Sequence, residues 1–154
     1  AGKEIVVPKP GADPAADSVP AVRAREAVLA DTPRVAIRTP NLVGSLNLKG
    51  ARIDDLVLAN PLYTETLAPG SPAIRLLSPS GAPGAYFTSV GWSGAGAPPS
   101  DALWTASAAT LTPQAPVTLS WSNPQGVRFE ILLSVDDQFM FTATQRVVNA
   151  TAAP

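Results

Sequence analysis

Residues 117–149 have the sequence VTLSWSNPQGVRFEILLSVDDQFMFTATQRVVN, and this stretch decides the fold class. It holds three runs rich in β-branched and aromatic residues, separated by two short polar segments. Asn123-Pro124-Gln125-Gly126 places proline and glycine where a tight turn favours them, and Asp136-Asp137-Gln138 joins the second and third runs. The pattern predicts strands over 117–122, 127–135 and 139–148 that form a meander of two hairpins.

The same pattern extends back to residue 34. Short runs with period-two alternation lie between clusters of Pro, Gly, Asn and Asp, which is typical of consecutive strands. In residues 42–49, Leu42, Gly44, Leu46 and Leu48 share one phase, which should face a core. No long amphipathic helix interrupts the runs, and parallel sheets need crossover connections. We therefore predict an all-β, antiparallel β-sandwich with further strands over 35–39, 42–49, 51–58, 73–77, 85–92 and 103–106.

Residues 1–33 have a different composition, rich in Ala, Pro and small polar or charged residues. Such a segment cannot bury enough apolar surface to offset the entropy lost on ordering. We predict a disordered N-terminal tether over 1–33, followed by the β-sandwich over 34–154. Residues 21–30 (AVRAREAVLA) are good helix formers, so one short helix is expected there when docked. Charged residues and prolines near the start do not match a signal peptide.

Composition excludes several classes of function. The 154 residues suit one domain, and 11 Lys and Arg against 12 Asp and Glu leave a net charge of −1, too weak a field to attract nucleic acid. The chain has no cysteine and no histidine. It therefore lacks disulfides, thiolate nucleophiles, Cys-ligated zinc and the commonest general base. The apolar runs are far shorter than the ~20 residues of a membrane-spanning helix.

Two pairs of adjacent carboxylates, Asp54-Asp55 and Asp136-Asp137, are candidates for chemistry. Paired acids can share a proton, bind calcium or act as acid and base. Neighbouring residues on a strand point to opposite faces, however, and Asp is common in tight turns. We expect Asp136-Asp137 to form a hairpin turn and Asp54-Asp55 to lie on a solvated strand segment.

Short motifs with serine and glycine do not support catalysis. Ser78-Pro79-Ser80-Gly81 and Gly91-Trp92-Ser93-Gly94 differ from the nucleophile-elbow pattern, and there is no histidine to activate a serine. Gly91, Gly94 and Gly96 lack the spacing and lysine of a phosphate loop. The sequon at Asn149-Ala150-Thr151 has meaning only in a secretory eukaryotic host.

Aromatic residues offer one further site. They could line a groove for a peptide or a sugar, because aromatic faces bind apolar and CH-rich surfaces. They could equally form the core or rim of the sandwich. The residues are Trp92, Trp104, Trp121, Tyr86 and Phe87.

A series of segments resembles a known family. The first is GSLNLKGARIDDL over 44–56, and RLLSPSG over 75–81 follows. AYF at 85–87 precedes Gly91-Trp92, and LTP at 111–113 precedes PVTLSW at 116–121. The last is VDDQFMFT over 135–142. In order and spacing the series is similar to the first large periplasmic domain of YidC-type membrane-protein insertases, in their alphaproteobacterial form.

The resemblance implies a β-supersandwich related in shape to galactose mutarotases, at the periplasmic face of the bacterial inner membrane, in a multi-pass protein that inserts and folds membrane proteins. The implied partners are nascent inner-membrane proteins and accessory subunits of the Sec translocon. It implies no cofactor or metal, and it assigns no catalytic, cofactor-binding, metal-binding or partner-binding residue. The family domain continues with further strands beyond Pro154, so the sandwich is expected to be incomplete. Asn60-Pro61-Leu62 and Glu130-Ile131 depart from the family pattern.

Three functions remain open on this basis. The first is a non-catalytic periplasmic domain that assists insertion through contacts with partners or nascent chains. The second is a carbohydrate-binding or mutarotase-like domain, although the mutarotase reaction normally uses histidine. The third is a spacer without specific contacts.

Overall fold

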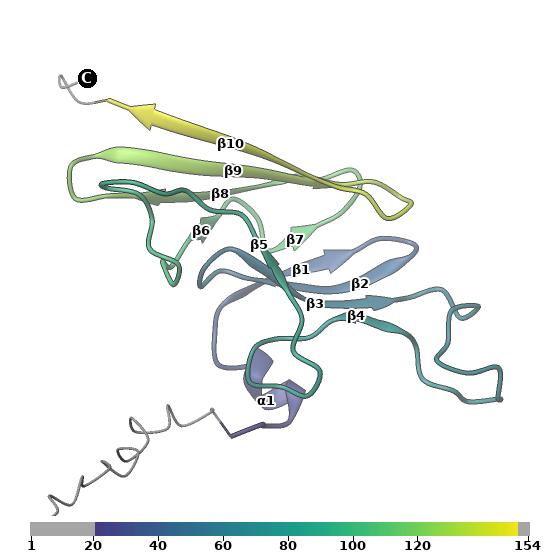
Figure 1. Ribbon diagram of the computed structural model, residues 1–154. Coiled ribbons are helices and arrows are strands. Elements are labelled where there is room, and N and C mark those ends of the chain that lie inside the picture. Colours follow the sequence, from purple (N-terminus) through teal and green to yellow (C-terminus); the bar gives the residue numbers. More distant parts are fainter. Residues whose placement is uncertain (1–20, 151–154) are drawn as a thin grey trace, which may run out of the picture.

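Two β-sheets packed in layers form the fold, in a computed structural model that describes residues 21–150 (Figure 1). The larger sheet has the strand order β4-β3-β2-β1-β7, with β5 also paired to β3, and the smaller has the order β10-β9-β8-β6. The predicted all-β class is confirmed. Residues 1–20 of the predicted tether lie outside the described residues. The elements are α1 (Arg25–Leu29), β1 (Arg34–Arg38), β2 (Leu42–Asn47), β3 (Arg52–Leu58), β4 (Arg75–Leu77), β5 (Thr88–Ser89), β6 (Thr105–Ala106), β7 (Thr110–Leu111), β8 (Val117–Ser122), β9 (Val127–Val135) and β10 (Phe141–Asn149).

The predicted meander forms the smaller sheet, and both hairpins are present. β8 pairs with β9 and β9 with β10, antiparallel throughout. In the first turn, Asn123 Oδ1 accepts hydrogen bonds from the backbone N–H groups of Gln125 and Val127. Gly126 has φ of 86°, a left-handed conformation that glycine adopts without strain from a Cβ atom. Local turn chemistry therefore sets this register.

In the second turn the two aspartates have different roles. Asp136 Oδ1 accepts hydrogen bonds from the backbone N–H groups of Gln138, at 2.9 Å, and Met140, at 2.8 Å. Asp137 contributes its backbone carbonyl, which accepts a hydrogen bond from Asn41 Nδ2 at 2.7 Å. The turn predicted for this pair is thus observed, and only the side chain of Asp136 holds it closed.

This difference leads to a first prediction. Asp136→Ala is expected to lower the free energy of unfolding by about 1 kcal/mol, because two backbone donors lose their acceptor. Asp137→Ala keeps its backbone carbonyl and should change the value by less than about 0.5 kcal/mol. Urea denaturation of both variants measures the difference. Equal losses in the two variants would contradict the assignment.

One strand pair departs from the antiparallel prediction. β1 and β7 run parallel, with Ala36 opposite Thr110 and Ile37 opposite Leu111. The connection from β1 to β7 needs no crossover helix. The chain runs through β2 to β5 of the larger sheet, crosses to the smaller sheet at β6 and then returns to the larger sheet as β7. β7 was not predicted, since two residues are too few for a periodic signal. The predicted strand over 85–92 shrinks to β5, which shares one edge of β3 with β4.

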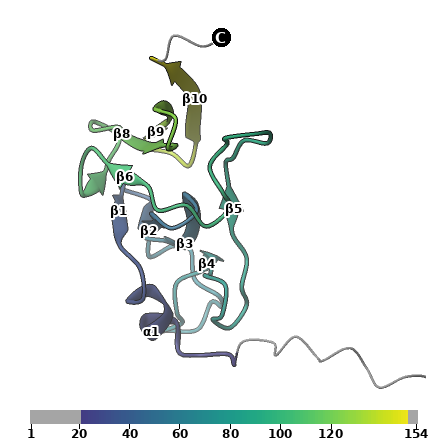
Figure 2. The ribbon, with the colours of Figure 1, turned by 90° about the vertical axis from the view of Figure 1, so that its left-hand side faces the viewer.

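The core lies between the two layers, which both views separate clearly (Figures 1 and 2). The leucine phase of residues 42–49 faces it as predicted: Leu42 and Leu46 are buried and Leu48 packs against the cluster. Side chains from both sheets are fully buried there, so the apolar faces of the two sheets cover each other. They include Ile37, Leu42, Leu46, Leu111, Leu119 and Ile131.

The helix α1 lies on the other face of the larger sheet, away from β8–β10 (Figures 1 and 2). No residue of α1 is buried, so apolar burial contributes little to its position. Just before it, the backbone N–H of Arg23 donates a hydrogen bond to the carbonyl of Gly81 at 2.9 Å. Polar contacts therefore dock this segment. The division of the chain into a linker and a domain at residue 34 stays a prediction.

Candidate functional site

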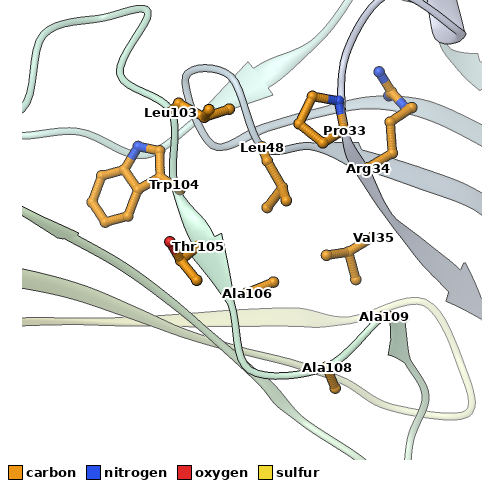
Figure 3. A pocket seen from close by; sticks show the side chains of 10 residues that line it. All are labelled: Pro33, Arg34, Val35, Leu48, Leu103, Trp104, Thr105, Ala106, Ala108 and Ala109. Atoms are coloured by element: carbon orange, nitrogen blue, oxygen red, sulfur yellow. The ribbon is translucent and has the colours of Figure 1, made fainter.

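An open cleft of about 430 Å³ lies between the start of β1 and the segment that carries β6 (Figure 3). Leu48 after β2, Val35 of β1 and Ala106 of β6 point toward one another across it (Figure 3), and its lining also includes Leu103 and Trp104. Trp104 is only 4% exposed, whereas Leu103 is 60% exposed at the mouth. The cleft is thus a continuation of the core that opens to the surface.

The lining of this cleft is almost entirely apolar. Among the described residues that line it, Arg34 alone is charged. The Arg34 guanidinium is engaged elsewhere, by Asp54 and by Ser45 Oγ at 2.7 Å. Within residues 21–150, no group of three or more His, Cys, Asp or Glu side chains could hold a metal ion. The cleft can therefore accept apolar side chains, and its lining within residues 21–150 contains no Asp, Glu, His, Lys or Cys.

The tryptophans lie in the core or against it: Trp104 is buried, and Trp92 and Trp121 are partly buried. Trp92 stacks on Trp104, with ring centroids 5.7 Å apart, and both Trp92 and Trp121 contact Phe129. Phe87 is 41% exposed and lies beneath the Arg52 guanidinium, which is 5.1 Å from its ring centroid. The five aromatic residues that could have lined one groove are thus divided between the core and the surface.

A small pocket does bring Phe87 close to Trp92 and Trp104. Its volume is about 200 Å³, below the ~300–1,000 Å³ of most small-molecule sites. Tyr86, which is 71% exposed, and Trp121 do not line it. This arrangement does not favour the carbohydrate alternative.

The prediction of a solvated strand segment for Asp54-Asp55 is wrong. Asp54 is 2% exposed and Asp55 is 7% exposed. Asp54 pairs with Arg34, and Asp55 pairs with Arg25 of α1 and accepts a hydrogen bond from Ser45 Oγ at 2.7 Å. A buried ionic cluster thus joins the segment before the sheet to the outer face of β2 and β3.

A β-bulge explains why both carboxylates point the same way. Ser45 lies opposite Asp55, but the next residue of β2, Leu46, lies opposite Ile53, so Asp54 is an extra residue in β3. A bulge redirects side chains that would otherwise alternate. Ile53 and Leu56 both pack on the core although they are three positions apart. That spacing is the one signal in the sequence that could have revealed the bulge.

The electrostatics of this region follow from burial and pairing. Burial lowers the pKa of Arg25, and the nearby Arg75 guanidinium lowers it further. At the exposed end of the segment, the hydrogen bond from Arg23 lowers the pKa of Asp31. Arginine stays protonated at neutral pH, so the buried carboxylates are neutralised by fixed cations. We therefore assign Asp54 and Asp55 a structural role instead of calcium binding or acid–base catalysis.

The serine and glycine motifs also have structural roles. Ser78 Oγ donates a hydrogen bond to the carbonyl of Pro83 at 2.9 Å, inside the turn that follows β4. The carbonyl of Gly91 accepts a hydrogen bond from Gln145 Nε2 of β10 at 3.0 Å. Both motifs belong to connections between strands, as expected.

Comparison with known proteins identifies the family. Residues 34–154 match the family described as the YidC periplasmic domain. The chain belongs to this family. A membrane protein insertase YidC of Beijerinckia indica is 51% identical over 135 residues, which are 84% of this chain and 22% of that protein. The corresponding insertase of Methylobacterium radiotolerans is 48% identical over 92% of this chain and 23% of its own length.

A third relative, the YidC of Rhizobium meliloti, is 43% identical over 95% of this chain and 26% of its own length. The predicted resemblance to the alphaproteobacterial YidC domain is thus confirmed, and the chain is a periplasmic domain of a non-catalytic family. It spans about a quarter of the length of the curated relatives it matches. The comparison with solved structures found no match. Within residues 21–150, no helix is long and apolar enough to cross a membrane.

Proposed function

We propose that this YidC periplasmic domain assists the insertion and folding of inner-membrane proteins through non-catalytic contacts with nascent chains or with partner proteins. The related proteins are named membrane protein insertases, and that activity is carried to this chain here as part of the proposal. Accessory subunits of the Sec translocon are the partner proteins that the family resemblance implies.

The observation that carries this proposal is the apolar cleft between β1 and β6. At about 430 Å³ it falls within the size range of ligand sites, ~300–1,000 Å³, and can hold several apolar side chains. Its one charged lining residue, Arg34, is neutralised by the buried Asp54. Apolar surface that stays accessible beside a packed core favours binding of another chain over chemistry.

Site-specific photocrosslinking tests the proposal in the full-length insertase. A photoreactive amino acid at Leu103, at the mouth of the cleft, is expected to crosslink to a nascent membrane protein or to a translocon subunit during insertion. Leu132 is the matched control, because it is 44% exposed on β9 and does not line the cleft. Equal crosslinking from Leu132, or no crosslinking from Leu103, would count against the cleft as the contact site.

A further inference from the structure

A second surface lies where two loops meet at one end of the sandwich. We define it as the acidic tip: residues 59–74, between β3 and β4, and residues 136–140, between β9 and β10. The rings of Tyr63 and Phe139 meet edge to face, with centroids 6.4 Å apart, and Asn41 anchors the hairpin through the carbonyl of Asp137. The two loops therefore form one continuous surface.

This surface exposes large apolar side chains. Leu67 is fully exposed and Leu62 is 83% exposed, and Met140 on the facing loop is 66% exposed. Tyr63 and Phe139 are each more than 40% exposed despite their contact. Residues 59–73 also surround a hollow of about 530 Å³. Apolar side chains gathered beside a hollow are typical of a surface that binds another molecule.

The charges of the acidic tip all have one sign. Its charged side chains are Glu65, Asp136 and Asp137, and neither loop contains lysine or arginine. Along the chain, the 59–74 loop is followed directly by Arg75, at the start of β4, and the cation nearest to the 136–140 loop is Arg146 in β10. An anionic bilayer would be repelled, and a second copy docked by the same surface would place carboxylates against carboxylates. A partner with positive charge beside apolar side chains fits.

We infer that the acidic tip binds a peptide segment whose apolar side chains are flanked by lysine or arginine. Leu62, Leu67 and Met140 would contact the apolar part, and the three carboxylates would attract the flanking cations. The chemistry of the segment follows from the tip itself. Only the source of the segment, a nascent chain or a partner protein, rests on the proposed function.

Peptide titration of the purified chain tests this inference. The probes are a fluorescent peptide with a leucine–alanine core and lysines at both ends, and a matched peptide with glutamates in place of the lysines. The lysine peptide is expected to bind about tenfold more tightly or better, with a preference that shrinks as salt is added.

Variants locate the site. Leu62→Ser together with Leu67→Ser should weaken binding of the lysine peptide about tenfold or more, because both side chains lose apolar contacts. These side chains are exposed, so the thermal unfolding midpoint should not change. Leu132→Ser, at a 44% exposed position of β9 that lines neither the cleft nor the hollow of the tip, is the matched control and should bind like the unmodified chain.

Four results would overturn the inference. They are equal binding of the two peptides, no binding of either, a loss of binding in Leu132→Ser but not in the tip variant, and binding of anionic vesicles in preference to the lysine peptide. None of these depends on crosslinking from Leu103 in the insertase. The cleft and the acidic tip can therefore fail separately.

Discussion

Gly44→Ala is expected to lower the free energy of unfolding by about 3 kcal/mol or more, a large fraction of the total stability of a domain of this size. A Cβ atom on Gly44 would lie 1.9 Å from the backbone carbonyl oxygen of Asp55 and 2.7 Å from its carbon. Neither backbone atom can move without separating β2 from β3 beside the bulge. The glycine is therefore required for the close approach of these two strands.

Urea denaturation followed by circular dichroism measures this effect. Gly91→Ala is the matched control, because a Cβ atom there meets nothing within 4 Å and its φ is not in the left-handed region. That variant should be unchanged, or more stable by up to about 1 kcal/mol, since alanine restricts the unfolded chain. A stable Gly44→Ala variant would mean that β2 and β3 do not approach each other this closely.

Asp54→Ala is expected to cost about 3–5 kcal/mol, the usual penalty for leaving a buried charge without its partner. The side chains of Arg34 and Asp54 are 12% and 3% exposed, so solvent cannot replace the missing carboxylate. Chemical denaturation measures the loss. The double variant Arg34→Met with Asp54→Leu should recover most of it, because a well-packed apolar pair avoids the desolvation of two charges.

Asp31→Ala is the control for Asp54→Ala, because it removes one partner of an ion pair at the surface instead of a buried one. Asp31 and Arg23 are about half exposed, and an exposed ion pair contributes little to stability. The unfolding midpoint of this variant should not change. If Asp54→Ala behaved in the same way, or if the double variant were as unstable as the single one, Arg34 and Asp54 would not form a buried pair that depends on both charges.

Much of the fold could be predicted because the signals are local. Proline and glycine after Asn123, and aspartate at residue 136, set two hairpins through contacts within four residues. The period-two leucines of residues 42–48 select the face that packs on the core. A chain with no histidine and no cysteine also lacks the side chains that most often serve in catalysis and metal binding.

The candidate sites could be predicted only in part. The cleft brings together Leu48, Leu103 and Val35 from segments far apart in the chain, and no pattern within any one strand marks it. The acidic tip depends on the contact between Tyr63 and Phe139, which belong to two loops that are far apart in the chain. Leucines in a loop are not by themselves a signal, because single exposed apolar residues are common.

The sequence by itself determined the strand-rich class, the meander of residues 117–149 and the family, because turn chemistry, alternation and motif order depend on neighbouring residues. Only the tertiary structure decided that the side chains of Asp54 and Asp55 are buried and which arginines they pair with. Their partners Arg34 and Arg25 are 20 and 30 positions away, and the bulge that turns both carboxylates to one face exists only in the register of β3 against β2. Alternation alone predicts opposite faces, and pairing with a second strand is what changes that outcome.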